Sequence, residues 1–496
     1  MGQADLYRQA GELQRAEEAY AEVLELEPEH AEALYRLGEM AVLSGDSSRG
    51  AGLIQRAISI DASRAYYHYS LGCALHASDW RGAIAAYRRA LDLEPGNQGA
   101  RMNLGCLLQE RGELEAAWLG DERAAQYLDE ASAHFRAVHD IAPGNPAALL
   151  NLGYTLERQL KPEEALRYYE RALALEPELA EARFNRSMLL LAQGRFREGW
   201  QEYEWRWKAG GLARPVYPQA EWDGSPLGGG TVLLYTEQGF GDAIQFIRYA
   251  AAVAARGARV LVRCPPQLQR LFETAAGVSQ TVAPEQPLPD FEAYCALLDL
   301  PRLLAEERIP ADVPYLRADD ALAARWRMEI GDGSDLRIGL VWASQTMARI
   351  APFKCVPPQA FAPLSDLPGT QFYSLQKGEA AKELEIAGAP IRAENLDDRI
   401  EDFADTAAVI ENLDLTITVD TAVAHLAGAM GKPVWTLLPY VPDWRWYPDA
   451  DSSRWYPGMR LYRQSERGNW KTVLERVAED LQRLTRRAQP DITRRT

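Results

Sequence analysis

The sequence contains few cysteines and has no excess of positive charge. Five cysteines are scattered over 496 residues, and no two of them have the spacing of metal ligands. The 54 basic residues are outnumbered by 71 acidic residues, so the net charge is −17. This charge argues against a nucleic-acid backbone as the main partner and gives no support for a membrane surface. We therefore predict a protein without structural zinc and without a nucleic-acid partner.

Long apolar segments are also missing. No apolar run is long enough to span a bilayer, and the first residues lack the basic-then-apolar order of a signal peptide. Leu6 occupies the position at which a myristoylation signal requires Ser or Thr. The sequence therefore predicts a reduced, cytoplasmic protein with no membrane span. Because the chain is too long for one core, we expect two to four domains.

The first part of the chain contains an internal repeat. Four glycines and one serine recur with steps of 34, 33, 48 and 34 residues: Gly38, Gly72, Gly105, Gly153 and Ser187. Each unit predicts two amphipathic helices, which the small residue allows to approach closely. The long step indicates an insertion near residues 118–128 that lengthens or interrupts one helix pair.

This period and pattern resemble tetratricopeptide repeats over roughly residues 1–206. The resemblance implies an α-solenoid of about six units, to which we assign residues 1–215. The first unit begins almost at Met1, which indicates either a longer natural chain or a frayed helix. The concave face of such a solenoid binds a protein or peptide, and a rigid spacer or dimer surface is the alternative.

A segment rich in glycine and proline separates the repeats from a second pattern, in which short apolar runs alternate with helices. The first helix of this pattern is expected at 242–256. The alternation predicts parallel sheets, and a break near residue 320 divides them into two Rossmann-like lobes. We assign residues 216–320 to the first lobe, 321–485 to the second, and 486–496 to a tail.

In the second lobe, one strand–helix junction is the strongest candidate for an anion site. Residues 413–419 predict a buried strand, and Asp420 is placed at the N-cap of a helix over 421–430. A helix that begins where a parallel strand ends gathers backbone amides around an anion such as a diphosphate. Every doubly wound sheet has such turns, so the junction is either a site or part of the scaffold.

A similar junction in the first lobe carries Gly239, Gly241 and Asp242. Ile244 stands where a dinucleotide-binding loop has its third glycine, and Arg263 stands where that fold has an acidic residue for ribose. A nicotinamide oxidoreductase is therefore disfavoured. Asp242 is either a helix cap or, at the mouth of a cleft, a general base.

These motifs, Gly-Phe-Gly-Asp-Ala at 239–243 and Asp-Thr-Ala-Val-Ala-His at 420–425, resemble those of the heptosyltransferase-like (family 9-type) glycosyltransferases. More closely, the chain is similar to bacterial proteins that join tetratricopeptide repeats to such a module. The domain pairing also resembles the O-linked N-acetylglucosamine transferases. Further matching motifs begin at Gly199, Gly339, Ser374, Asp402 and Asp443. The resemblance implies an α + α/β chain, with a repeat solenoid followed by a GT-B module of two Rossmann-like lobes.

The resemblance implies a hexosyl-, heptosyl- or N-acetylglucosaminyl-transferase. It would move a sugar from a nucleotide-diphosphate sugar to a protein or glycan acceptor, with inversion and without a metal or cofactor. The first lobe would hold the acceptor and the second the donor. Asp242 would take the proton of the acceptor hydroxyl. The residues expected to bind the donor are Gly239, Gly241, Lys354, Gln376, Lys377, Asp420, Thr421, Ala422 and His425.

One loop departs from the family pattern. Between Ser344 and Lys354 the spacing is kept, but Ala348, Ala351 and Pro352 replace the usual His, Asp and Arg. The altered loop favours a second hypothesis. In it, the protein is a non-catalytic repeat scaffold whose degenerate transferase domain binds a partner protein or a nucleotide.

Several residues have two interpretations. His425 is the only histidine after residue 139, and it is either a core residue or a donor ligand. Lys377 either supplies positive charge to the leaving group or lies in a solvated turn. The aromatic run at 443–448 either stacks on the donor or packs in a core. Asp449-Ala-Asp451 has the spacing of a metal-binding pair without supporting ligands, so we expect no metal there.

Overall fold

The computed structural model divides into two compact units. The first comprises Met1–Glu115 and Glu122–Ala182, and the second comprises Ala116–Asp121 and Arg183–Thr496. The structure describes residues 1–118, 122–211, 213–305, 308–310, 312–331, 333, 335–344, 354–365, 367–384, 390–446 and 451–488. The substituted positions of the altered loop, Asp449, and most of the predicted tail lie outside these residues. No helix among the described residues is long and apolar enough to cross a membrane.

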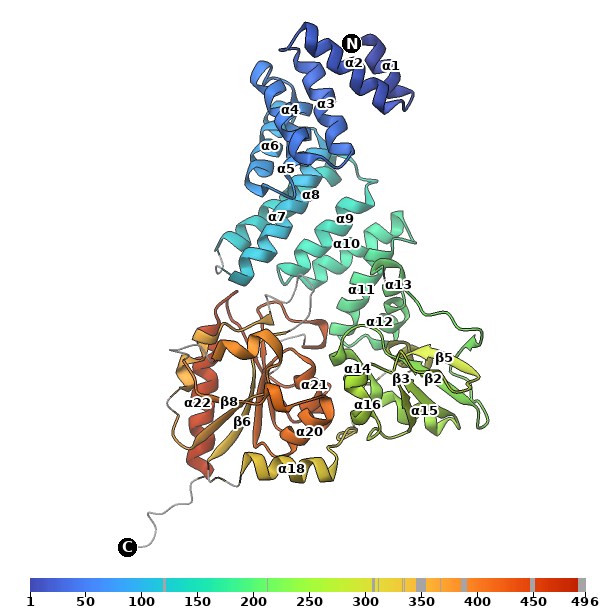
Figure 1. Cartoon of the computed structure of the whole chain (residues 1–496), viewed down its shortest axis with the longest axis vertical. Helices are drawn as coiled ribbons and strands as arrows, with labels where there is room; N and C mark the ends of the chain where they lie inside the picture. The colour runs from blue at the N-terminus through green and yellow to red at the C-terminus, as the bar shows by residue number, and fades with distance from the viewer. Residues whose placement is uncertain are drawn as a thin grey trace. The chain divides into compact units, whose positions relative to one another are not determined.

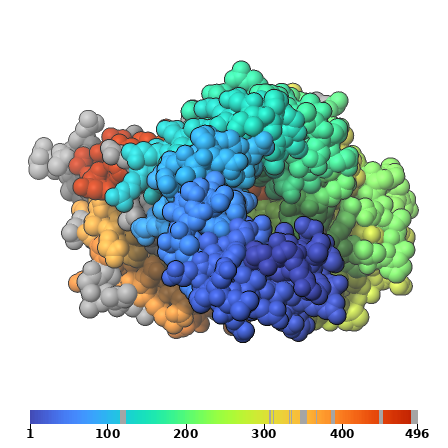
Figure 2. Space-filling model, turned by 90° about the horizontal axis from the view of Figure 1, so that it is seen from above, coloured from blue at the N-terminus to red at the C-terminus, as the bar shows by residue number. Residues whose placement is uncertain are grey.

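The first unit is built from successive helix pairs (Figure 1). The pairs are α1 (Gly2–Gln9) with α2 (Leu13–Leu26), α3 (Ala31–Leu43) with α4 (Ser47–Ile60), α5 (Ala65–Leu75) with α6 (Trp80–Leu93), α7 (Gln98–Trp118) with α8 (Glu122–Ile141), and α9 (Pro146–Arg158) with α10 (Pro162–Leu175). Helices α7 and α8 have 21 and 20 residues, whereas α9 and α10 have 13 and 14. The extra residues of the long step therefore lengthen one pair. The side chains of α1 to α4, in blue, form one continuous surface (Figure 2).

Local sequence explains how each pair forms, as α9 shows. The Asn145 side chain accepts a hydrogen bond from the Ala148 N–H, and Pro146 occupies the first helical position, where its missing N–H costs nothing. Leu149 and Leu152 then fall on one face and are fully buried. Helix propensity and the apolar stripe therefore agree over this segment.

The recurring glycines lie where the paired helices touch. A Cβ atom on Gly105 would lie 2.7 Å from the ring of Phe135, and one on Gly153 would lie 2.7 Å from the ring of Tyr169. Only glycine lets the second helix bring a ring so close to the backbone of the first. The predicted role of this position is confirmed.

The second unit contains most of α11 (Ala180–Ala192), then α12 (Phe196–Tyr203), α13 (Arg206–Ala209) and two sheets whose paired strands are all parallel. The first sheet has the order β1-β5-β2-β3-β4 and the second β11-β10-β9-β6-β7-β8. The strands are β1 (Ala220–Glu221), β2 (Thr231–Tyr235), β3 (Arg259–Arg263), β4 (Val278–Val282), β5 (Ala293–Ala296), β6 (Leu336–Val341), β7 (Thr370–Ser374), β8 (Ala393–Asn395), β9 (Leu415–Val419), β10 (Val434–Leu438) and β11 (Met459–Arg463).

Helices connect these strands, as parallel pairing requires. They are α14 (Phe240–Phe246), η1 (Ile247–Tyr249), α15 (Ala250–Ala255), α16 (Pro266–Phe272), η2 (Leu297–Asp299), α17 (Leu300–Leu303), α18 (Asp320–Ile330), η3 (Pro358–Leu364), η4 (Gly378–Leu384), η5 (Asp397–Arg399), α20 (Phe403–Glu411), α21 (Ala422–Ala429), η6 (Trp444–Trp446) and α22 (Trp470–Ala488). Two parallel sheets with connecting helices are the two predicted Rossmann-like lobes. The predicted fold class, a repeat solenoid followed by a GT-B-type module, is confirmed.

The helix predicted over 242–256 is wrong in its bounds. It begins at Phe240 and is interrupted by η1. Two side-chain donors explain the interruption, because they take carbonyls that a regular helix would use. The Tyr315 hydroxyl donates to the Ile244 carbonyl at 3.1 Å, and Arg248 Nε donates to the Gln245 carbonyl at 2.9 Å.

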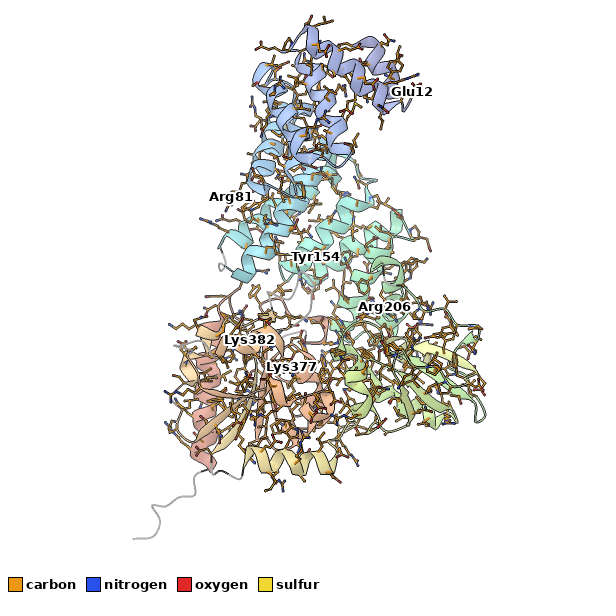
Figure 3. All side chains as sticks on the ribbon, viewed as in Figure 1. Glu12, Arg81, Tyr154, Arg206, Lys377 and Lys382 are labelled. Atoms are coloured by element: carbon orange, nitrogen blue, oxygen red, sulfur yellow. The ribbon has the colours of Figure 1, made fainter. Side chains whose placement is uncertain are left out.

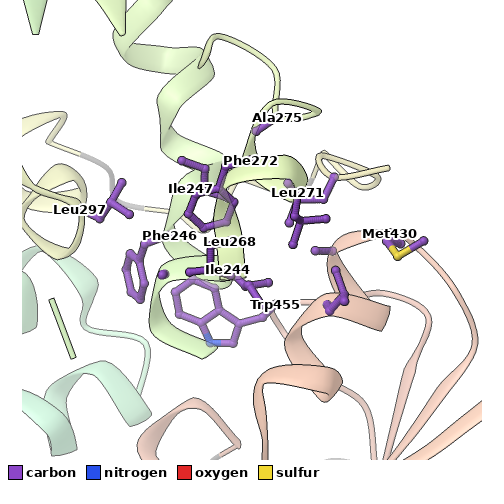
Figure 4. Close-up of a cluster of buried hydrophobic side chains, with 14 of the residues drawn as sticks. Ile244, Phe246, Ile247, Leu268, Leu271, Phe272, Ala275, Leu297, Met430 and Trp455 are labelled. Carbon is purple, nitrogen blue, oxygen red and sulfur yellow. The ribbon is translucent and has the colours of Figure 1, made fainter. Parts of the chain in front are cut away.

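A shared apolar core joins the two lobes. Ile244 and Ile247 of the α14–η1 segment and Leu271 of α16 belong to the same buried cluster as Met430 and Trp455 of the second lobe (Figure 4). Burial of this surface is the main favourable term that holds the lobes together. It brings the start of α14 and the start of α21 to one place.

Candidate functional site

The junction between β9 and α21 differs slightly from its prediction. The N-cap of α21 is Thr421, and not Asp420 as predicted, so the helix begins one residue later. Asp420 does not cap the helix because its carboxylate pairs with Lys354 Nζ at 2.5 Å. The Thr421 hydroxyl in turn pairs with the Thr418 hydroxyl at 3.0 Å. No described side chain therefore caps the first amides of α21.

Lys354 and Asp420 form a buried ion pair. Only 7% of Asp420 is exposed. Burial alone would raise the pKa of this carboxyl, but the Lys354 ammonium and the nearby His425 outweigh burial and hold the pKa below its usual range. Burial would likewise lower the pKa of Lys354, and Asp420 outweighs it and raises that pKa. Both groups are therefore charged, and the pair is stable around neutral pH.

The first-lobe junction holds Asp242 by both carboxylate oxygens. Gly239 is the N-cap of α14, and its N–H donates to Asp242 Oδ2 at 3.0 Å. Arg445 Nη2 donates to Asp242 Oδ1. Burial raises the pKa of Asp242, and the neighbouring Arg445 and Gly239 N–H only partly oppose the rise. A carboxylate with a raised pKa is a stronger base than an exposed one, which suits a general base.

The two junctions meet at Gly241. A Cβ atom on this residue would lie 2.9 Å from His425 Cδ2 and 3.6 Å from Ala422 Cα. Glycine is therefore needed where α14 lies against the first turn of α21. The fold brings one set of predicted residues together at this contact: Gly239, Gly241, Asp242, Lys354, Asp420, Thr421, Ala422 and His425.

His425 is buried in this contact. Its Nδ1 lies 2.9 Å from the Tyr456 hydroxyl, and its ring stacks on Trp446 with centroids 5.3 Å apart. Burial, helped by the positive charge of Arg445, lowers the pKa of His425 to about 3. The imidazole is therefore neutral at physiological pH. His425 is therefore packed as a core residue beside the candidate site.

Gln376 and Lys377 have structural partners at the end of β7. Gln376 Oε1 accepts hydrogen bonds from the N–H groups of Trp342 and Ala343, at 3.2 and 2.9 Å. Figure 3 labels Lys377. Its Nζ donates to the carbonyl oxygens of Asp397 and Ile400, the latter at 2.8 Å. These bonds join neighbouring strand ends of the second sheet. The contact of Gln376 and Lys377 with a donor stays a prediction.

Sequence reasoning missed Arg445. The motif at Asp443 drew attention for its tryptophans, yet the arginine between them links the lobes. Its backbone N–H and Nη1 donate to Asp443 Oδ1 at 3.0 and 2.9 Å, and its guanidinium lies over Trp444 at 4.3 Å. A basic residue flanked by tryptophans was the available signal, because such an arginine is commonly buried and paired.

A second missed group supports the loop that carries Gly239. Arg206, which Figure 3 labels, stands at the start of α13 and is 1% exposed. It pairs with Glu237 and Asp299, each at 2.8 Å. Burial raises the pKa of Glu237 to about 7, although Arg206 opposes the rise. Arg206 therefore anchors α13 to the segments that follow β2 and β5 of the first sheet.

The tryptophans of the 443–448 motif pack in a core. Trp444 and Trp446 are buried, as are the neighbouring Trp455 and Tyr456. Trp444 and Trp455 meet edge to face at 5.8 Å. Of the two interpretations of these side chains, the structure shows core packing. Among the described residues, no group of three or more His, Cys, Asp or Glu could hold a metal ion.

Fold and site together define a class of protein, a helical repeat array followed by a two-lobed α/β module. Comparison with protein families agrees. Residues 1–65, 74–125 and 146–179 match tetratricopeptide repeat models, and residues 377–464 match the glycosyltransferase family 9 (heptosyltransferase) model. The chain therefore carries tetratricopeptide repeats and a heptosyltransferase-family domain, as predicted. The transferase match includes the β9–α21 junction and lies wholly in the second lobe, so Asp242 is outside it.

Two curated proteins are similar to parts of this chain. Protein FlbA of Caulobacter vibrioides is 28% identical over 341 residues, which cover 61% of this chain and 55% of FlbA. Cellulose synthase 2 operon protein C of Komagataeibacter xylinus is 34% identical over 118 residues, covering 23% of this chain and 9% of that protein. The chain thus spans about half the length of the first and a small part of the second.

Solved structures of other proteins are similar to part of this chain. The crystal structure of MamA is 26% identical, with a TM-score of 0.31, and the match covers 36% of this chain and 90% of MamA. YrrB, described as a tetratricopeptide repeat protein with an unusual peptide-binding site, is 27% identical with a TM-score of 0.32. That match covers 36% of this chain and 86% of YrrB.

Proposed function

We propose that this protein transfers a sugar from a nucleotide-diphosphate sugar to a protein or glycan acceptor, with Asp242 as the general base. One observation carries the proposal. Asp242 and the uncapped start of α21 meet at a single lobe contact, through Gly241. In a chain with a heptosyltransferase-family domain, this contact is the natural position for the reacting groups. The transferred group would be a hexosyl, heptosyl or N-acetylglucosaminyl residue.

In this mechanism the second lobe holds the donor diphosphate. The amides at the start of α21 carry partial positive charge and attract an anion, and Lys354 adds a full charge beside them. The same charges stabilise the leaving diphosphate as the bond from the sugar to its phosphate oxygen breaks. Positive charge in the proposal comes from the protein itself, so no metal or cofactor is assigned.

Asp242 acts on the acceptor from the first lobe. Its carboxylate takes the proton of the acceptor hydroxyl while that oxygen forms the new bond to the anomeric carbon. Attack from the face opposite the diphosphate inverts the anomeric centre. The raised pKa of Asp242 increases the driving force for the proton transfer. The products are the glycosylated acceptor and the nucleoside diphosphate, which leaves with the electron pair of the broken bond.

The repeats of the first unit would recruit the acceptor. Tetratricopeptide arrays offer an extended inner surface for peptides or partner helices, which fits a protein acceptor. A cytoplasmic setting belongs to the same proposal and rests on the low cysteine content and acidic charge of the sequence.

Nucleoside diphosphate release tests the proposal. The full chain is incubated separately with ADP-, UDP-, GDP- and CDP-sugars, and the release is measured for wild type and Asp242→Asn. We expect release from one family of donors and a loss of about 10²- to 10⁴-fold in the variant. Asp223→Asn, which removes an exposed aspartate of the same lobe, should retain the wild-type rate. A folded wild-type protein that releases nothing from any donor contradicts the proposal.

One observation favours a second candidate, a non-catalytic scaffold. The charged groups of the site are already paired with one another, Asp242 with Arg445 and Asp420 with Lys354. A domain that no longer turns over could keep such pairs for stability and bind a nucleotide or a partner protein. In that case a nucleoside diphosphate would raise the melting temperature by mass action, and no donor would be cleaved.

A further inference from the structure

Arg445 links the two lobes through charged and polar groups. Arg445 belongs to the second lobe. Its Nη2 donates a hydrogen bond to Asp242 and its Nε donates one to Gln245 Oε1, and both acceptors lie in α14 of the first lobe. Within the second lobe, Arg445 Nη1 and the Arg445 backbone N–H both donate to the Asp443 carboxylate. Arg445 is 9% exposed, so these contacts are screened little by water. Its bond to Asp242 can break while its bonds to Asp443 remain.

The charges at this contact do not favour a diphosphate as they stand. Three carboxylates, those of Asp242, Asp420 and Asp443, face two cations, Arg445 and Lys354, and His425 is neutral. The local sum is therefore one negative charge. A diphosphate would add further negative charge to a poorly screened place unless a cation exchanged its carboxylate for the phosphate.

A buried amide beside Arg445 points to the same ligand. Gln245 is fully buried, and its Nε2 has no hydrogen-bond partner among the described residues. Its Oε1 is held by Arg445, so the unused N–H donors of Nε2 belong to the same small group as the guanidinium. An unsatisfied buried donor costs about 1–3 kcal/mol and calls for an explanation. A phosphate oxygen would accept from both the amide and the guanidinium.

We propose that Arg445 recognises the donor diphosphate by exchanging Asp242 for a phosphate oxygen, with Gln245 as a second donor. This inference rests on the proposed transferase function. No bond is made or broken covalently in the exchange. Its consequence is that Asp242 loses its cationic partner only when donor is present. Proton removal from the acceptor is thereby coupled to the occupation of the donor site.

The exchange makes a prediction for equilibrium binding that does not require turnover. ADP, UDP, GDP and CDP are titrated separately into the full chain by calorimetry, and the tightest of them is used for the variants. Arg445→Gln should weaken binding by about tenfold or more, because a charge-assisted phosphate contact is lost. Asp242→Asn should tighten binding several-fold, because it frees Arg445. In the double variant this gain should nearly disappear, which a double-mutant cycle measures.

Two controls accompany the cycle. Arg270→Gln removes another arginine that joins the lobes, through Asp402 and Asp405, without touching the charged site, and should leave binding within about twofold. Arg445→Lys keeps the charge but not the planar fork, so its binding should fall between those of wild type and Arg445→Gln. If Arg445→Gln does not fold, as judged by circular dichroism, Arg445→Lys takes its place in the double-mutant cycle.

Each outcome decides between the two proposals. Equal affinity for wild type and Arg445→Gln would overturn the inference and leave the transferase proposal intact. If Asp242→Asn raised the affinity for the nucleoside diphosphate equally with and without Arg445, the cause would be simple repulsion between Asp242 and the diphosphate. That result would also overturn the inference. Absence of binding by wild type and by every variant would overturn both the inference and the donor site itself.

Discussion

Replacing Arg206 with methionine tests whether the buried ion cluster holds the second unit together. Arg206 is the cation that pairs with Glu237 and Asp299, and all three side chains are buried. Methionine fills a similar volume without charge, so packing against Trp207 and Tyr203 is largely kept. The change therefore isolates the electrostatic contribution of the guanidinium.

The expected loss is large because the buried Glu237 carboxylate is left without its cation, and the buried Asp299 keeps only the more distant Arg214, at 3.6 Å. Removing one partner of a buried pair costs about 3–5 kcal/mol. For a unit of this size, about 1 kcal/mol corresponds to roughly 1.5 °C in Tm, so the shift should be about 5–8 °C. Even in the wild type, the rise of the Glu237 pKa from 4.5 to about 7 represents roughly 3 kcal/mol of destabilisation above pH 7.

The pH dependence gives the sharper test. A carboxyl whose pKa is raised by folding is favoured in its protonated form, so its penalty is absent well below pH 4.5 and grows until the pH passes its pKa in the folded state. Without Arg206 that pKa rises further. The variant should therefore lose more free energy of unfolding at pH 8.5 than at pH 5.5, where Glu237 can take up a proton.

Thermal and urea unfolding of wild type and variant at the two pH values measure this difference. Arg195→Met, which removes one half of an exposed ion pair with Glu198, is the matched control and should change stability by less than about 1 kcal/mol. Equal losses at both pH values, or none at either, would refute the argument that burial of Glu237 and Asp299 makes Arg206 essential.

Three further predictions follow from individual contacts. Gly153→Ala should destabilise the first unit by about 1–3 kcal/mol, because its Cβ would meet the Tyr169 ring at 2.7 Å. Gly144→Ala, whose Cβ would have nothing within 4 Å, is the control and should be nearly neutral. Thermal unfolding measures both variants. Gly241→Ala should lower nucleoside diphosphate release by about tenfold or more by pushing α14 from His425, and an unchanged rate would contradict the proposed site. The ring signals of His425 in NMR, assigned with His425→Gln, should show no protonation between pH 8 and 5, because its pKa is lowered to about 3. In the unfolded chain His425 is protonated near pH 6.5, so the free energy of unfolding should fall as the pH drops below that value. A His425 titration near pH 6.5 in the folded protein would contradict the prediction.

Much of the fold is encoded locally and could be predicted. The repeat is visible because a small residue must recur where a side chain of the next helix touches the backbone, as at Gly153. The buried strand predicted over residues 413–419 is present as β9, Leu415–Val419, because a run of apolar and β-branched residues predicts a buried strand. The short strands β1, β4, β5, β8 and β11 were not predicted, since brief or partly polar runs carry no clear period.

From local patterns alone, the candidate site was predictable only where the chain turns from strand to helix, whereas Lys354 was predicted from the family resemblance. Gly239, Asp242, Asp420 and Thr421 stand in such turns and carry their own local signal. Arg445 does not, because its partners Asp242 and Gln245 lie some 200 residues away in the sequence. The partners of Lys377 carried no local signal either, because they are the Asp397 carboxylate and the carbonyl oxygens of Asp397 and Ile400, beyond the next strand.

The sequence by itself therefore determined the two kinds of architecture and the positions of two strand–helix junctions, because hydrophobic period, capping residues and glycine act over a few neighbouring residues. Tertiary structure alone decided that these junctions touch at Gly241, that Asp242 is held by Arg445, and that Lys354 neutralises Asp420. Those outcomes depend on how a shared apolar core packs one lobe against the other. Burial there also sets the protonation of Asp242 and His425, which no local pattern encodes.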